Sequence, residues 1–134
     1  MRISVSTALL MASICLVPVA ASAASGSYIC AVSEVFECLA VTGCQRDELK
    51  DTHLSAFMVI DVDKKLITSA SIGEEPRSAN IAEGLSATDK ALYIYGTQNQ
   101  RTWNATVSLE TGALVGGITS GESSFAFFGN CTPK

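Results

Sequence analysis

The chain has 134 residues, a hydrophobic fraction of 48%, a charged fraction of 16% and a formal net charge of −4 at pH 7. This length suits a single domain. An acidic chain without a run of Lys or Arg cannot neutralise many phosphates, so nucleic acid is excluded as an expected partner and anionic lipid surfaces are disfavoured.

The N-terminal segment has the pattern of a cleaved signal peptide. Arg2 supplies a positive charge, Leu9–Ala21 is almost wholly apolar, and Ala21-Ser22-Ala23 is a small-x-small cleavage site. The apolar run is shorter than the roughly 20 residues that a transmembrane helix needs, so we expect no transmembrane anchor. Removal of residues 1–23 predicts a single exported β domain at residues 24–134, located in the periplasm or secreted.

Cysteine usage agrees with export. Cys15 belongs to the leader, and an even set remains: Cys30, Cys38, Cys44 and Cys131. Thiols pair in an oxidising compartment, and four cysteines allow three connectivities. Because Gly43 lets the segment between Cys38 and Cys44 turn back on itself, we favour a bridge between these two, which leaves Cys30 with Cys131. Spacing alone leaves the other connectivities open.

A metal site is the rival interpretation of the cysteines. Zinc sites usually carry paired C-x-x-C spacings, which this chain lacks, and its one histidine, His53, stands apart from the cysteines in the sequence. We therefore expect no metal, no cofactor and no catalytic thiol.

The sequence of the first half of the exported domain predicts strands separated by polar turns. Alternation over Tyr28–Cys38 places Cys30, Val32, Phe36 and Cys38 on one face, with Glu34 as an exception. Gln45–Asp51 is polar and rich in helix formers, so both a helical turn and a charged loop stay open. Phe57–Ile60 and Leu66–Thr68 flank a polar turn and predict a hairpin.

The second half has the stronger β pattern. Gly73–Lys90 is small and polar and predicts a long excursion, with a short helical turn at Ile81–Gly84. Ala91–Thr97 and Thr102–Leu109 predict a hairpin around Gln98-Asn99-Gln100. Ala113–Thr119 and Phe125–Cys131 complete a four-strand meander. The fold class expected is all-β: a small antiparallel meander forming a barrel or sandwich, stapled by disulfides, with at most one or two short helical turns.

Few residues of the chain suggest a catalytic or metal-binding site. His53 lies close in sequence to Asp47, Glu48 and Asp51, and a histidine beside carboxylates can act as a base or a metal ligand. An exposed loop histidine is the simpler interpretation, and we assign no catalytic residue.

Aromatic residues offer a candidate binding surface, formed by Tyr93, Tyr95 and Trp103, because Tyr and Trp anchor many interfaces. Tyr93 and Tyr95 share one face of their strand, opposite Leu92 and Ile94. Core packing is the competing role for these rings.

Two functions remain. The favoured one is a small exported non-enzymatic binding or inhibitor module that acts on an unknown protein or glycan in the cell envelope or outside the cell. The alternative is a small exported hydrolase or metal-dependent enzyme that uses His53 and a nearby carboxylate.

Overall fold

The computed structural model describes residues 25–52, 54–70, 77–80 and 83–134. The segment expected to be a signal peptide lies outside the described residues. The strands are β1 (Ser27–Leu39), β2 (Gly43–Asp47), β3 (Phe57–Asp61), β4 (Leu66–Ala70), β5 (Arg77–Asn80), β6 (Gly84–Ala87), β7 (Ala91–Gln98), β8 (Arg101–Ser108), β9 (Ala113–Thr119) and β10 (Ser123–Pro133), with one 3-10 turn, η1 (Leu49–Asp51).

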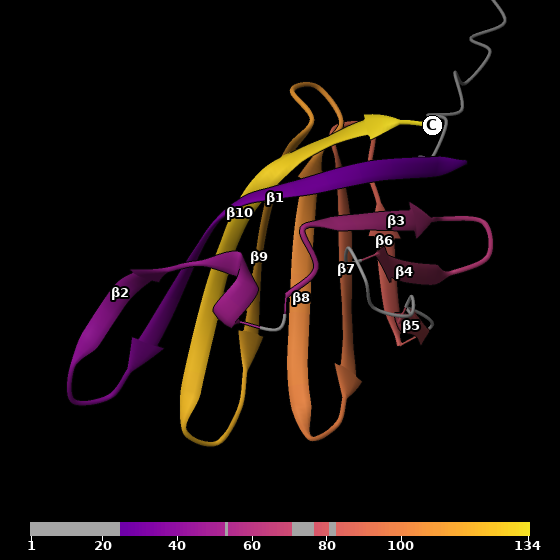
Figure 1. Ribbon diagram of the computed structural model, residues 1–134. Helices are drawn as coiled ribbons and strands as arrows, with labels where there is room; N and C mark the ends of the chain where they lie inside the picture. Colours follow the sequence, from indigo (N-terminus) through magenta and orange to yellow (C-terminus); the bar gives the residue numbers. More distant parts are fainter. Residues whose placement is uncertain (1–24, 53, 71–76, 81–82) are drawn as a thin grey trace, which may run out of the picture.

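All strands belong to one antiparallel sheet that curls into a half-barrel (Figure 1). The strand order is β5-β4-β3-β1-β10-β9-β8-β7-β6, and β2 adds a further pairing to β1. The all-β fold class, the meander and the short helical turn expected from the sequence are confirmed. Within the described residues, no helix has the length and apolar character required to cross a membrane.

The central strand β1 pairs with β10 along its whole length and divides its other edge between two partners. Its first part pairs with β3 and its last part with β2. A β-bulge between Val32 and Glu34 adds one residue to β1 relative to β10. Because side chains alternate between faces, an extra residue reverses the alternation beyond it.

The bulge corrects the expected faces of β1. Cys30 and Val32 are buried on the inner face, and after the bulge Val35 takes the inner position. Phe36 and Cys38 therefore point to the outer face, so the prediction that they share a face with Cys30 and Val32 is wrong. Glu34 is not an exception in this register, because its outward position suits a charged side chain.

Both disulfides join directly opposed residues of neighbouring strands. Cys30 is bonded to Cys131 across β1 and β10, and Cys38 to Cys44 across β1 and β2. This is the pairing that the sequence favours. Gly43, at φ 78°, adopts the left-handed conformation that closes the β1–β2 turn. Disulfides persist in oxidising compartments, so the two bridges indicate an extracytoplasmic environment.

The hairpins of the second half follow the predicted order, but the turn between β7 and β8 has two residues instead of the predicted three. β7 and β8 are joined by a two-residue turn at Asn99 and Gln100, both with positive φ, as the hairpin turn that matches strand twist requires. The hairpin formed by β3 and β4 is also confirmed.

Two expected loop segments contain regular structure. The polar segment Gln45–Asp51 divides into the end of β2 and the turn η1. The excursion expected over Gly73–Lys90 contains β5 and β6, so the prediction of a continuous loop there is wrong. Gly84 begins β6 rather than ending a helical turn, and Ile81 lies outside the described residues. Short, small-residue strands such as these carry little of the β-branched and aromatic composition by which strands are recognised.

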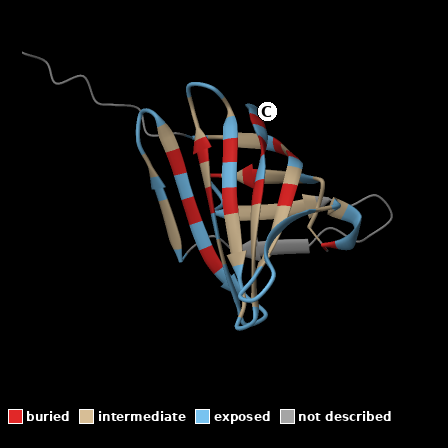
Figure 2. Ribbon diagram, turned by 90° about the vertical axis from the view of Figure 1, so that its left-hand side faces the viewer, coloured by how far each residue is buried: buried red, intermediate tan, exposed pale blue. Residues whose placement is uncertain are grey.

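The core lies on the inner face of the curl. Buried and exposed residues alternate along β7 to β10, as Figure 2 shows in red and blue. This alternation matches one covered and one open face of an antiparallel sheet. The buried apolar residues are Cys30, Val32, Val35, Ile60, Val62, Leu92, Ile94, Ala105, Val107, Leu114, Phe127 and Cys131.

Three aromatic rings lie across glycines that are their register partners on the next strand. A Cβ at Gly96 would stand 2.6 Å from the Trp103 ring, and one at Gly116 would overlap the ring of Phe127. Both pairs are on the inner face. The third pair, Gly84 and Tyr95, is on the outer face. An aromatic ring that covers a glycine shields backbone that would otherwise be open.

Candidate functional site

The outer face of β7 to β10 carries no charged side chain. Hydroxyl, amide, aromatic and small residues, together with the aliphatic Val115, fill every outward position of these four strands. Those positions are Ala91, Tyr93, Tyr95, Thr97, Thr102, Asn104, Thr106, Ser108, Ala113, Val115, Gly117, Thr119, Ser124, Ala126, Phe128, Asn130 and Thr132. Charges stand at the edges of this surface: the Glu83 carboxylate accepts a hydrogen bond of 3.1 Å from the Thr97 hydroxyl, and Glu34 of β1 is the register partner of Phe128. We call this surface the neutral face.

Exposed apolar side chains gather on the outer side of the sheet. Among the described residues, all the exposed large apolar side chains except Leu39 and Val41 project from it. They are Ile29, Phe57, Tyr93, Tyr95, Val115 and Phe128. Phe128 also makes an edge-to-face contact with Phe36, with ring centroids 6.0 Å apart. A surface on which exposed apolar residues cluster is typical of a binding site.

The ring of Tyr95 covers Gly84 on the neighbouring strand β6. Three atoms of its ring occupy the space that a side chain at Gly84 would need. Tyr95 is nevertheless 55% exposed, so much of its surface is open to solvent. Glycine at position 84 is therefore what allows the ring to rest on β6.

Tyr95 and Tyr93 each have polar neighbours in register. Asn104 of β8 stands opposite Tyr95, and Thr106 stands opposite Tyr93. Ser86 of β6 flanks Tyr93 on the other side. The carboxamide of Asn104 is exposed and has no hydrogen-bond partner within the described part of the chain. The patch formed by Tyr93, Tyr95, Asn104 and Thr106 therefore offers two ring surfaces beside the free amide donor and acceptor of Asn104.

The structure does not place Trp103 with the two tyrosines. Trp103 belongs to the inner face, where it packs against the core and over Gly96. Its indole Nε1 is buried and has no hydrogen-bond partner among the described residues. Of the three aromatic residues singled out from the sequence, only Tyr93 and Tyr95 share a surface.

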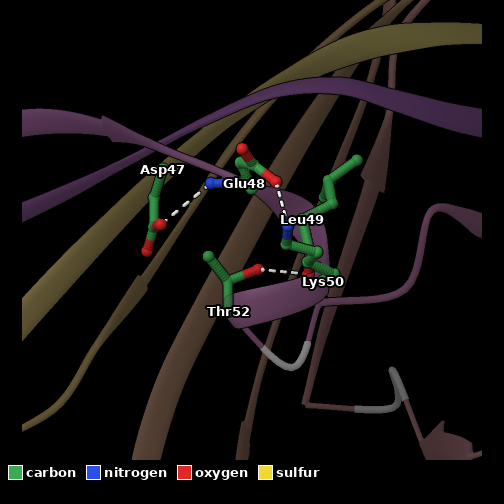
Figure 3. A network of polar contacts seen from close by, with 5 residues as sticks. All are labelled: Asp47, Glu48, Leu49, Lys50 and Thr52. Atoms are coloured by element: carbon green, nitrogen blue, oxygen red, sulfur yellow. Dashed lines mark hydrogen bonds and ion pairs between the residues drawn. The ribbon is translucent and has the colours of Figure 1, made fainter.

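Two of the three carboxylates expected near His53, those of Asp47 and Glu48, are engaged in local structure (Figure 3). Asp47 accepts the backbone N–H of Glu48 at 2.8 Å, and Glu48 forms an ion pair of 2.6 Å with Lys50. The hydrogen bond and charge of Lys50 lower the pKa of Glu48, and those of Glu48 raise the pKa of Lys50. The buried Thr52 donates to the carbonyl of Leu49 at 3.0 Å.

His53 itself lies outside the described residues. Across the described ranges, no group of three or more His, Cys, Asp or Glu residues has the arrangement of a metal site. Glu48, the acidic residue of this segment that carries an ion pair, is exposed, which is the environment of an ordinary surface carboxylate.

An open depression of about 530 Å³ lies along β1 where the pairing changes from β3 to β2. Ser33, Val35, Arg46 and Leu49 contribute to its lining. Arg46 is already paired with Glu34 at 3.2 Å. The depression therefore has few polar groups free to bind a ligand.

Sequence reasoning missed Asn104 and Thr106 as members of the patch, and it missed Gly84 as the residue on which the Tyr95 ring packs. The first two follow from hairpin register, because a two-residue turn at Asn99 and Gln100 fixes the partners of Tyr93 and Tyr95. Gly84 carries no such signal, since its pairing depends on where β6 begins.

Comparisons of the chain with protein-family models, with curated proteins and with solved structures find no match.

Proposed function

We propose that the protein is a periplasmic or secreted binding module without catalytic activity, and that the neutral face is its binding surface. The observation that carries the proposal is the absence of charge from every outward position of β7 to β10, combined with exposed aromatic side chains. The centres of macromolecular interfaces are depleted of charged residues and enriched in Tyr and Phe in the same way.

The scaffold supports this role because it holds the surface rigidly. β10 is bridged to β1 by the Cys30–Cys131 disulfide, and hydrogen bonds join β10 to β7 through β9 and β8. A surface that is already ordered loses less conformational entropy when a partner binds. The enzyme alternative has less support, because Asp47 and Glu48 already hold local partners.

A charge placed on the neutral face tests the proposal. Val115 is 48% exposed there, and Val41 is 96% exposed at the β1–β2 turn, so Val115→Glu and Val41→Glu make the same change on and off the face. Labelled mature protein is incubated with extracytoplasmic material, and the bound fraction is measured by sedimentation for insoluble material and by size-exclusion chromatography for soluble material. We expect Val115→Glu to weaken binding at least tenfold and Val41→Glu to leave it within twofold.

Equal effects of the two variants would contradict the assignment of the surface. Absence of binding by the wild-type protein to both fractions would contradict the function itself. Circular dichroism of each variant confirms that the sheet is intact before binding is compared.

A further inference from the structure

We infer that the patch formed by Tyr93, Tyr95, Asn104 and Thr106 binds an uncharged glycan built of pyranose rings. This inference rests on the proposed function, since it names the class of partner for the neutral face. It depends on four observations: the position of the Tyr95 ring on Gly84, the spacing of the two tyrosines, the kind of polar groups around them, and the absence of charge.

The orientation of Tyr95 favours a flat ligand. A ring that projects from a surface can enter a pocket of a protein partner as an anchor. The ring of Tyr95 packs on Gly84 while the residue stays 55% exposed, which favours contact through the exposed ring surface over insertion into a pocket. The face of an aromatic ring carries partial negative charge, which attracts the polarised C–H groups on one face of a pyranose.

The spacing of the two tyrosines suits an extended chain. Tyr93 and Tyr95 are two residues apart on β7 and point to the same face, so they lie about 7 Å apart along the strand. Tyr93 is 46% exposed and leaves ring surface open beside that of Tyr95. A polysaccharide that runs along β7 can therefore contact both rings.

The polar groups match sugar hydroxyl and acetamido groups. Asn104 offers an unpartnered amide donor and carbonyl acceptor next to Tyr95, and Thr106 offers a hydroxyl next to Tyr93. Neutral groups of this kind exchange hydrogen bonds with water for hydrogen bonds with a ligand without the desolvation cost of a charge.

The absence of charge on the neutral face disfavours charged partners. A charged polysaccharide or an acidic protein needs Lys or Arg on the binding surface, and the neutral face has neither among its outward positions. An uncharged polymer needs no such groups. The neutral face is therefore complementary in charge to a neutral glycan.

Insoluble cellulose, chitin and a carboxylated polysaccharide, alginate, serve as the probes. Binding isotherms are measured for wild-type mature protein at about 50 and about 500 mM salt. We expect binding to cellulose or chitin that changes less than twofold with salt, because screening acts on charges, and at least tenfold weaker binding to alginate. The two neutral probes distinguish plain glucose units from acetamido sugars, for which Asn104→Ala should reduce binding more strongly.

Matched variants assign the binding to the patch. Tyr95→Ala and Tyr93→Ala should each weaken binding to the neutral probe at least tenfold. Tyr95→Phe retains the ring, so its affinity should stay within threefold of the wild-type affinity. Phe57 is an aromatic of similar exposure, 49%, on the outer side of β3. Phe57→Ala should leave binding within twofold, and thermal unfolding of each variant separates lost binding from lost folding.

The outcomes separate this inference from the proposed function. No binding of the wild-type protein to cellulose or chitin, together with a soluble protein partner that is lost in Val115→Glu, overturns the glycan inference and leaves the binding module in place. A stable dimer that Val115→Glu dissociates also overturns it, because a second copy then occupies the face. Glycan binding that survives both tyrosine-to-alanine substitutions overturns the assignment of the patch.

Discussion

The indole of Trp103 lies across the α-carbon of Gly96, its register partner on β7. The two residues fit together because glycine has no side chain, and the ring covers backbone that water would otherwise reach. Trp103 is the one tryptophan in the chain, so its fluorescence reports directly on this contact.

Gly96→Ala should destabilise the domain by about 1–3 kcal/mol, because the added Cβ would stand 2.6 Å from the Trp103 ring and force it to move within a packed interior. Urea unfolding followed by Trp103 fluorescence measures the change. Gly121→Ala is the matched control, since a Cβ there meets no atom within 4 Å. A change below about 0.5 kcal/mol for both variants would show that the ring contact is unimportant.

Gly129→Ala should be the more damaging glycine substitution. A Cβ at Gly129 would overlap the carbonyl oxygen of Ala31 on β1, next to the bulge. Backbone cannot rotate away as a side chain can, so we expect a loss of about 3 kcal/mol or more, or failure to fold. Yield of soluble oxidised protein and the urea midpoint are compared with those of Gly96→Ala, and a milder effect than Gly96→Ala would contradict the close approach.

The two disulfides should contribute unequally to stability. Cys30–Cys131 spans a sequence separation of 101, whereas Cys38–Cys44 spans 6. Loop-closure entropy then predicts losses of about 4–5 kcal/mol for the Cys30→Ala, Cys131→Ala pair of substitutions and about 2 kcal/mol for the Cys38→Ala, Cys44→Ala pair. Urea unfolding under non-reducing conditions tests the order, and a larger loss from the short loop would refute it.

Acid should remove a contribution that Asp61 makes to the stability of the folded state. Its carboxylate accepts the backbone N–H of Lys64 at 2.9 Å and pairs with the Lys64 ammonium at 3.1 Å, and these contacts lower the pKa of Asp61 below its ordinary value of 3.8. A carboxyl whose pKa is lower in the folded state stabilises above the unfolded pKa and loses that effect as the pH falls through the folded value.

The stability difference between wild type and Asp61→Asn should therefore shrink from about pH 5 to about pH 2. Thermal unfolding across this range measures it. Asp89→Asn, in the exposed turn before β7, is the control for the general effect of removing a carboxylate. A difference that grows with acid would mean that Asp61 is not held in its charged form by Lys64.

The local elements were predictable because turn chemistry and alternation act over a few residues. Gly43 marked the β1–β2 turn and the short disulfide, and polar tips marked the hairpins of β3–β4 and β7–β8. The separation of Leu92 and Ile94 from Tyr93 and Tyr95 onto opposite faces of β7 also followed from alternation, although alternation did not show which face is buried.

The remaining features depend on pairing between distant strands. Nothing in the local pattern of β1 marks Ser33 as an extra residue, and the bulge there moved Phe36 and Cys38 to the outer face. β5 and β6 escaped prediction because their small residues gain strand structure from their neighbours. The patch could be predicted only in part, since Tyr95 on Gly84 requires the register of β6.

The central pair of the sheet has a consequence for the order of folding. β1 is the first and β10 the last of the described strands, yet they are neighbours, and their pairing joins the group of strands on the β3 side to the group on the β9 side. The pairing that unites the sheet thus waits for β10 to be synthesised, and it joins strands that are far apart in the sequence. The eleven-residue strand β10 acts as the step that joins the two groups, so a deletion that removes it leaves two groups of hairpins with no shared edge.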